Sequence, residues 1–273
     1  MTTKICFITA IYSQYEKTCK PFIQQTIPTD FICFTSEPDM QPNGWIIDTT
    51  PYHLENPNPF DDHTYVNSLC NNQHTFNIAK YYKQSFQYIP RLRAYDVVIW
   101  IDATVEIHND RVSEYIMQHI YSHKIIGWHH EWRHGKMMEE VKASLVEDKY
   151  KYALWNNQLQ PFQDVAKQYD TYVKHGYRDD FFNTYRHLQE PTREHFGMWV
   201  TCFVAFLQHD PAVARFLELW YLQTLKHTTQ DQVSFAYVCQ KMQMVPMTLP
   251  NHEITGDHPH DGTHFYRKHD HGR

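Results

Sequence analysis

The chain has 273 residues and 42% of them are hydrophobic, which is enough for one large domain, or two small ones, with a substantial core. Charged residues make up 21% and only 8 glycines occur, so the composition excludes a disordered or fibrous chain. The net charge is −6 and no block of lysine and arginine occurs, so the basic patch of a nucleic-acid-binding protein is missing and we expect no nucleic acid partner.

The first half of the chain alternates short apolar runs with amphipathic segments. The runs are four to six residues long and predict strands that are buried on both faces. They are residues 5–10, 31–35, 45–48, 97–101 and 124–128. Two segments with apolar residues at helical spacing, 77–86 and 112–121, lie on either side of 97–101. The order β, β, β, α, β, α, β predicts an α/β fold with a mainly parallel central sheet flanked by helices.

The second half continues this pattern. Residues 136–190 are expected to be mostly helical, and the long apolar run 198–207 predicts a buried strand. Two amphipathic helices follow, 212–226 and 231–241, the first directly after an Asp-Pro start signal. Because no repeat and no clear linker occurs, we expect a single domain over residues 1–250, followed by a His-rich C-terminal tail, 251–273, without periodicity.

The N-terminal apolar run is too short to span a membrane, and no signal-peptide cleavage pattern follows it. The six cysteines contain no C-x-x-C pair, which argues against a zinc knuckle or a redox motif. We therefore expect a cytoplasmic protein with free thiols and no integral membrane segment.

A single acid, Asp102, follows the apolar run 97–101. In open α/β sheets, ligands bind beyond the carboxyl ends of the strands. A carboxylate at that edge can hold a divalent cation or a ribose hydroxyl. The alternative is that Asp102 only stabilises the turn that follows the strand.

The residues around Asp102 resemble the metal-site motif of GT-A glycosyltransferases, in which an apolar strand is followed by Asp-small-Asp. Here the sequence is Ile99-Trp100-Ile101-Asp102-Ala103-Thr104, with Thr104 in place of the second acid. Other matching residues, in chain order, are Asn77-x-x-Lys80, His129-His130, Arg133, Glu139-Glu140, His209, Phe216, Trp220 and Asp231-Gln232-x-Ser234-Phe235-x-Tyr237-Val238. Over about residues 4–242, this order is similar to the glycosyltransferase-like domain family of unknown function that includes the plant seed-mucilage glycosyltransferases and bacterial relatives.

The resemblance implies a GT-A-like fold and transfer of a sugar from a nucleotide-sugar donor to a glycan or other hydroxyl acceptor. It implies that the base and ribose of the donor lie near Thr9, Ala10 and Tyr12, that Lys80 faces the diphosphate, and that Asp102 holds a metal or the ribose. The expected donor-binding set is completed by Thr104, His130, Arg133 and Gln232. The choice of His130 and Arg133 rests on the cluster of His and Trp after an apolar strand, although an exposed loop could have the same composition.

Two acids are candidate catalytic residues. Asp231 begins a predicted helix, where the dipole stabilises a carboxylate, so a helix cap is one interpretation. The other is that Asp231 faces the donor or the acceptor, as general base if transfer inverts the anomeric centre or as a group that orients the sugar if transfer retains it. Glu194 could hydrogen-bond sugar hydroxyls or be a solvated loop acid.

The need for a divalent cation is left open by Thr104, because its hydroxyl brings no charge. One possibility is Mn²⁺ or Mg²⁺ held by Asp102 together with a histidine of the tail such as His264. The other is that Lys80, Arg133 and the histidines neutralise the departing diphosphate without a metal.

Two other functions compete with sugar transfer. A metal-dependent hydrolase of the amidase type would need a ligand set such as H-E-x-x-H, which the sequence lacks. A non-catalytic module that binds carbohydrate or nucleotide would keep the fold without the chemistry, and Thr104 keeps this alternative open.

Overall fold

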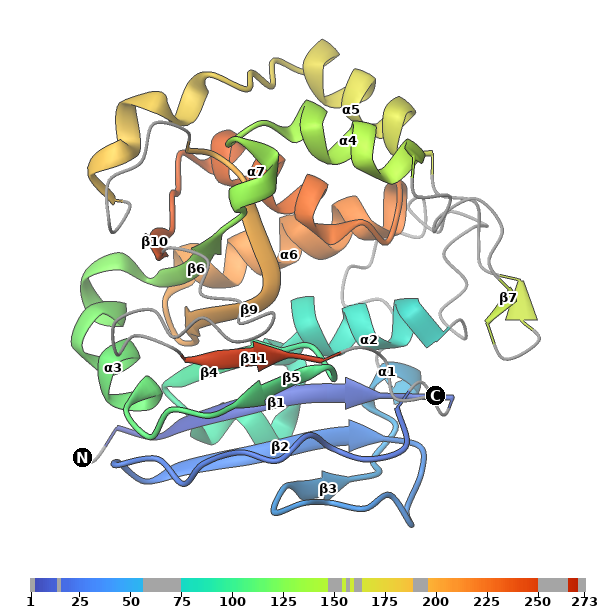
Figure 1. Ribbon diagram of the computed structural model, residues 1–273, viewed down its shortest axis with the longest axis vertical. Coiled ribbons are helices and arrows are strands. Elements are labelled where there is room, and N and C mark those ends of the chain that lie inside the picture. The colour runs from blue at the N-terminus through green and yellow to red at the C-terminus, as the bar shows by residue number, and fades with distance from the viewer. Residues whose placement is uncertain are drawn as a thin grey trace.

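In the computed structural model, which describes residues 3–13, 16–55, 75–146, 154–155, 158–159, 164–188, 196–249 and 265–269, the apolar runs form a seven-stranded sheet (Figure 1). Its strands are β1 (Ile5–Ile11), β2 (Thr29–Thr35), β3 (Ile46–Asp48), β4 (Val97–Ile101), β6 (Ile125–His129), β9 (Trp199–Leu207) and β10 (Met247–Leu249). They lie in the order β10-β6-β9-β4-β1-β2-β3. Neighbouring strands are parallel except that β9 runs antiparallel to both β4 and β6. The expected α/β fold with a mainly parallel, mixed sheet is confirmed.

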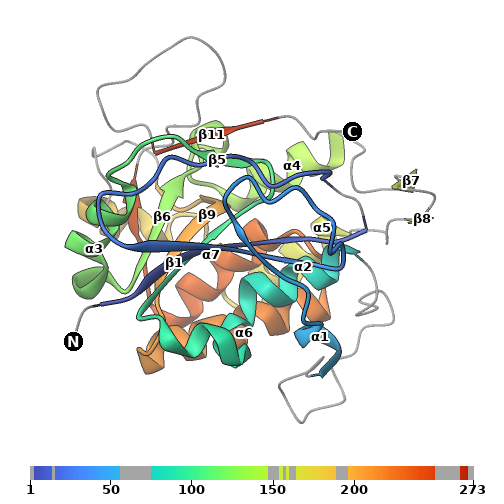
Figure 2. The ribbon, with the colours of Figure 1, turned by 90° about the horizontal axis from the view of Figure 1, so that it is seen from below.

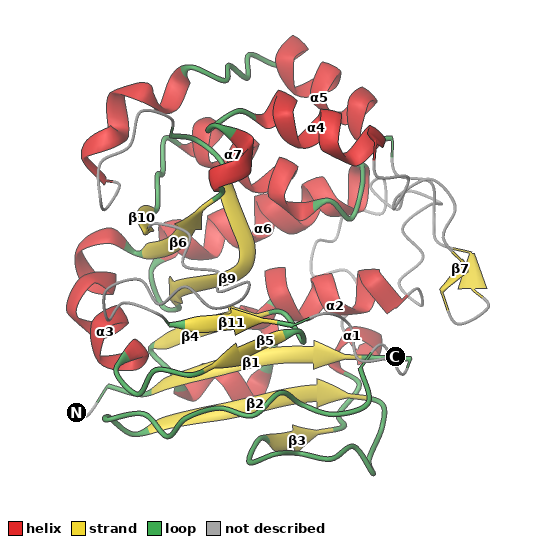
Figure 3. Ribbon diagram, viewed as in Figure 1, coloured by secondary structure: helices red, strands yellow, loops and turns green. Residues whose placement is uncertain are grey.

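Helices cover both faces of this sheet, and Figure 3 shows the alternation of the two kinds of element. The α-helices are α1 (Tyr52–Glu55), α2 (Thr75–Gln84), α3 (Val112–His123), α4 (Met137–Val146), α5 (Val165–Lys174), α6 (Pro211–Lys226) and α7 (Asp231–Met242). Short 3₁₀ helices are η2 (Phe86–Tyr88), η3 (Pro90–Ala94), η4 (Glu131–Arg133) and η5 (Phe181–Leu188). One face of the sheet packs against α2, α6 and α7, and the other against α3 (Figure 2). The helices α4 and α5 pack on each other and on α7.

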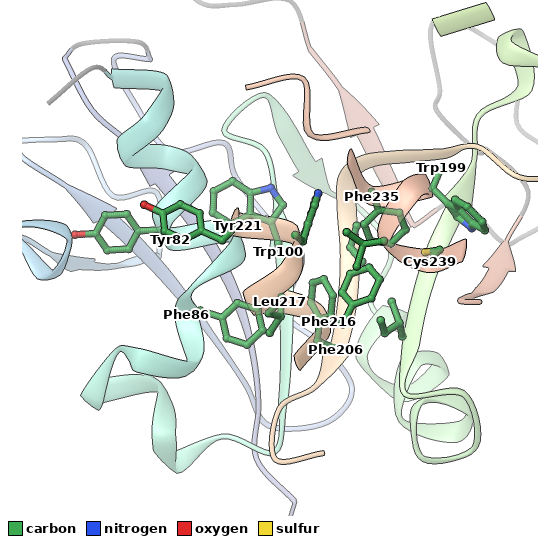
Figure 4. Packing of buried hydrophobic residues seen from close by; sticks show 14 of the residues in the cluster. Tyr82, Phe86, Trp100, Trp199, Phe206, Phe216, Leu217, Tyr221, Phe235 and Cys239 are labelled. Atoms are coloured by element: carbon green, nitrogen blue, oxygen red, sulfur yellow. The ribbon is translucent and has the colours of Figure 1, made fainter. Parts of the chain in front are cut away.

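Alternation of side chains along the strands builds a separate core on each face. In β1, Cys6 and Ile8 point toward α2, whereas Ile5 and Phe7 point toward α3. The core on the α2 face is rich in aromatic rings, and Figure 4 shows Trp100 of β4 within it. Because each strand contributes side chains to both cores, residues on both of its faces are apolar. The sequence therefore shows continuous apolar runs and not an alternation of apolar and polar residues.

Short strands were not predicted from the sequence. Besides β10, these are β5 (Val105–Ile107), β11 (Tyr266–Lys268), β7 (Leu154–Trp155) and β8 (Gln158–Leu159). Three residues are too few to show a period, so β11 lies unrecognised in the tail for which no regular structure was expected. β11 pairs antiparallel with β5 because buried aromatic rings fix it: Tyr266 lies 5.3 Å from Trp128 and 5.5 Å from Phe203, centroid to centroid.

Five cysteines lie in the described part of the chain, and all five are buried and free of disulfides. They are Cys6, Cys19, Cys33, Cys202 and Cys239. Within the same residues, no helix combines the length and the apolar content needed to cross a membrane.

Strand β4 carries Asp102 at its end, so its packing should govern both stability and the site. We expect Ile99→Ala, in the fully buried centre of β4, to lower the free energy of unfolding by about 2–5 kcal/mol. Urea unfolding followed by circular dichroism measures this. The matched control is Ile46→Ala in the edge strand β3, where the side chain is 39% exposed and the cost should be clearly smaller. Equal costs for both variants would contradict this description of the core.

Candidate functional site

Polar side chains from distant parts of the sequence meet at one edge of the sheet. Asp102 follows the carboxyl end of β4, and His130 follows the carboxyl end of β6. Because β9 is antiparallel to both, its amino-terminal end lies at the same edge and carries Thr201. The helix α7 begins there with Asp231, whose side chain is held by Thr201.

Asp231 is a buried carboxylate surrounded by donors. Its Oδ1 accepts a hydrogen bond from the Thr201 hydroxyl at 3.1 Å, and its Oδ2 lies 2.9 Å from Lys80 Nζ and 2.5 Å from Lys83 Nζ. Burial by itself would raise the pKa of this carboxyl, but the two ammonium groups outweigh it and lower the pKa to about 2. The backbone is fixed as well, since the Trp220 indole donates to the Asp231 carbonyl at 2.9 Å. Gln230, not Asp231, is the N-cap of α7, and the Asp231 carboxylate is turned toward the lysines.

Lys80 and Lys83 reach this carboxylate together because residues three apart lie on the same face of the helix α2. The Lys83 side chain is only 1% exposed, and its ammonium also lies 3.6 Å from Asp102 Oδ1. Burial by itself would lower the pKa of Lys83. The negative charges of Asp102 and Asp231 together raise it by more than burial lowers it, so the pKa lies above its usual value. For Lys80, burial outweighs the attraction of Asp231 and lowers the pKa. Lys83 therefore links the two acids that the sequence singled out.

Asp102 is the accessible member of this group, with a side chain that is 41% exposed. Its Oδ1 accepts a hydrogen bond of 2.7 Å from the indole of Trp100, which fixes the orientation of the carboxylate. Asp102 also opens the turn into β5, since its carbonyl accepts from the Val105 amide at 2.9 Å. The backbone of Asp102 thus forms the turn that one interpretation expected, and its carboxylate is exposed to solvent.

A second polar cluster is joined to the first through α7. Gln232, next to Asp231, donates from Nε2 to Oε1 of the buried Glu140 at 3.1 Å. The other oxygen of Glu140 accepts from Arg133 Nε and lies 3.7 Å from His130 Nε2. Burial, helped by the positive charge of Arg133, lowers the pKa of His130 to about 3, so this imidazole is neutral at pH 7.

Four of the expected donor-binding residues are buried. Ala10 and Tyr12 are buried on the α2 face, and the Tyr12 hydroxyl donates to that of Tyr82 at 2.8 Å. Thr9 is buried, and among the described residues its hydroxyl has no hydrogen-bond partner. Thr104 is buried, with its carbonyl bonded to the His269 amide at 2.9 Å. Glu194 and His264 lie outside the described residues.

The sequence analysis missed Lys83, and it named Glu140 only within the pair Glu139-Glu140, without its contacts to Gln232 and Arg133. The signal for Lys83 was its position three residues after Lys80 on an amphipathic helix, which places both ammonium groups on one face. No local signal indicates the partners of Glu140, because they come from η4 and from α7, and Gln232 lies 92 residues further along the chain.

Among the described residues, no three His, Cys, Asp or Glu side chains converge on a point where a metal could bind. At the expected position, Asp102 is a single carboxylate beside a lysine, and Thr104 adds no charge. Mg²⁺ and Mn²⁺ are ordinarily held by carboxylates whose negative charge is not already balanced by a neighbouring lysine.

Comparison with family models and with curated protein sequences gives no match. Among solved structures, the chain is similar to mouse xyloside xylosyltransferase 1 in its apo form, with a TM-score of 0.47 and 8% identity over 92% of this chain and 86% of that one. It is also similar to the bifunctional glycosyltransferase WbbM in its apo form, with a TM-score of 0.44 and 11% identity over 87% of this chain. The aligned part is 38% of the WbbM chain. At these values the likeness assigns no activity to this protein.

The buried charge of Asp231 should be essential for stability. Asp231→Asn leaves Lys80 without its carboxylate and Lys83 with the more distant Asp102 alone, and we expect it to lower the free energy of unfolding by about 3–5 kcal/mol, measured by urea denaturation. The control is Asp180→Asn, which removes the acid of the exposed Arg178–Asp180 pair and should change stability little. A stable Asp231→Asn protein would show that the lysines have other partners.

The buried His130 should make stability depend on pH. Its pKa of about 3 in the folded state lies below the 6.5 of a free imidazole, so between these values the unfolded chain binds one more proton. Stability should therefore fall as the pH is lowered from 6.5, with His130 contributing a slope of up to about 1.4 kcal/mol per pH unit. The variant His130→Asn should show a shallower fall in urea unfolding between pH 6.5 and 4, and the exposed His187→Asn is the control. Parallel curves for wild type and His130→Asn would contradict the buried, neutral imidazole.

Proposed function

We propose that this protein is a glycosyltransferase that moves a sugar from a nucleotide-sugar donor to a glycan or other hydroxyl acceptor. The observation that carries the proposal is the exposed carboxylate of Asp102 at the carboxyl edge of the sheet, with the buried ammonium group of Lys83 directly behind it. Ligands of open α/β sheets bind at this edge. The motif resemblance around Asp102 and Asp231 supports the same function, because both residues belong to this cluster.

Sugar transfer from such a donor releases a nucleoside diphosphate, and fixed positive charge must stabilise it. Lys80 and Lys83 provide two ammonium groups whose positions are set by Asp231 before any ligand arrives. Lys80 is the more accessible of the two, with 16% of its side chain exposed against 1%. Charges that are already in place cost no reorganisation when the leaving group departs.

The carboxylates take different roles in this proposal. Asp102, oriented by Trp100, accepts hydrogen bonds from hydroxyl groups of the donor ribose or sugar. Asp231 has a pKa of about 2 and binds two lysines and Thr201, so it is a weak base. We assign it to holding the lysines in position, and the proton of the acceptor is then taken by another group if transfer inverts the anomeric centre.

Turnover of nucleotide sugars tests the proposal. The protein is incubated with a panel of UDP and GDP sugars and an oligosaccharide acceptor mixture, and release of the free nucleotide is measured. One donor should be consumed, and Asp102→Asn should lower its turnover by about 10²-fold or more, because a charged contact to the donor is lost. The control is Asp39→Asn on an exposed turn, with the melting temperature of each variant measured in parallel.

The same panel separates an enzyme from a binding module. A donor that raises the melting temperature but releases no nucleotide identifies binding without transfer. Full turnover by Asp102→Asn, or no response to any donor, would contradict the proposed site.

A further inference from the structure

The ammonium group of Lys83 lies between the carboxylates of Asp102 and Asp231, in the position that a cation shared by these two acids would take. Its ammonium is 3.6 Å from Asp102 Oδ1 and 2.5 Å from Asp231 Oδ2, so one positive charge bridges the two carboxylates. With Lys80 on Asp231 as well, the group holds two ammonium groups and two carboxylates and is electrically balanced. A side chain that is 1% exposed cannot be exchanged for an ion from solution without moving α2.

The surroundings of Lys83 hold its charge in this position. The ring centroids of Trp100 and Trp220 lie 5.6 and 5.7 Å from its Nζ, within the range of cation–π attraction. A buried ammonium that lost its carboxylates would remain without compensation, which is costly in an apolar environment. Two acids and two indoles thus lie close to the Lys83 ammonium.

A divalent cation bound to Asp102 would lie close to the positive charge of Lys83. The ion would lie beside the Lys83 ammonium, which is itself buried, and two charges of the same sign repel each other. The Asp102 carboxylate would have to give up its contact with Lys83, and Thr104 offers no second charge to compensate.

We propose that Lys83 takes the place of the divalent cation at this site, so that the donor nucleotide is bound and released without a metal ion. The proposal rests on the proposed function for the identity of the ligand. The internal cation itself rests only on the contacts of Lys83 with Asp102 and Asp231, and these can be tested without any donor.

The decisive experiment removes the internal cation. Lys83→Gln leaves Asp102 with no ammonium and Asp231 with Lys80 alone, so the two acids become available to an ion. We expect saturating Mn²⁺ to raise the melting temperature of Lys83→Gln by at least about 2 °C and to leave EDTA-treated wild type unchanged. The double variant Lys83→Gln/Asp102→Asn should lose the response, which locates the ion. Lys174→Gln, on the exposed end of α5, is the matched control and should behave as wild type.

Direct binding to the wild-type protein keeps the proposal testable if Lys83→Gln fails to fold. The electron paramagnetic resonance signal of free Mn²⁺ should not decrease on addition of wild-type protein, and donor turnover should be the same in EDTA and in Mn²⁺. Stoichiometric Mn²⁺ binding that disappears in Asp102→Asn or in His264→Ala, or turnover that EDTA abolishes and Mn²⁺ restores, would overturn the proposal. If no donor reacts but Lys83→Gln gains the Mn²⁺ response, the internal cation stands and the proposed function fails.

Discussion

The structure of the polar edge depends on one buried carboxylate, that of Asp231. Two lysines of α2 and a threonine of β9 contact it, so it connects α7 with one helix from the first third of the chain and one strand from the last third. A buried charge is tolerated only if it is fully paired, and here the pairing also determines how α2, β9 and α7 must pack. Lys83 also contacts Asp102. The position of the exposed Asp102 carboxylate therefore depends on the buried pair of Lys83 and Asp231.

The antiparallel strand β9 makes this arrangement possible. A parallel strand at its position would begin at the opposite edge of the sheet and would carry Thr201 away from Asp102. Since β9 instead begins at the edge where β4 and β6 end, the residues that follow β4 and β6 lie near the start of β9. The second cluster, around Glu140, depends on the same reversal, because Gln232 lies in the first turn of the helix that Thr201 anchors.

Most of the fold could be predicted from the sequence, and the site only in part. The strand 97–101 and the two C-terminal helices were evident because continuous apolar runs and helical spacing are local signals. The partner of Lys83 could not be predicted, since Asp231 lies 148 residues later and nothing near Lys83 indicates it. Tyr12 shows the opposite difficulty: a tyrosine after a strand fits a base-binding loop and a core position equally well, and its stacking with Tyr82 is a tertiary contact that no local pattern predicts.

The pairing of β5 with β11 has a consequence for how the protein is made. The segment directly after Asp102 receives its strand partner from residues 266–268, so ribosomes must add more than 150 further residues before that partner exists. During this interval the ring of Trp128, which later packs on Phe265 and Tyr266, has only part of its apolar surroundings. Contacts between such distant segments form slowly and leave apolar surface exposed in the meantime. During synthesis there is therefore a period in which all seven strands of the main sheet can have formed, while β5, directly after Asp102, still lacks its partner strand β11.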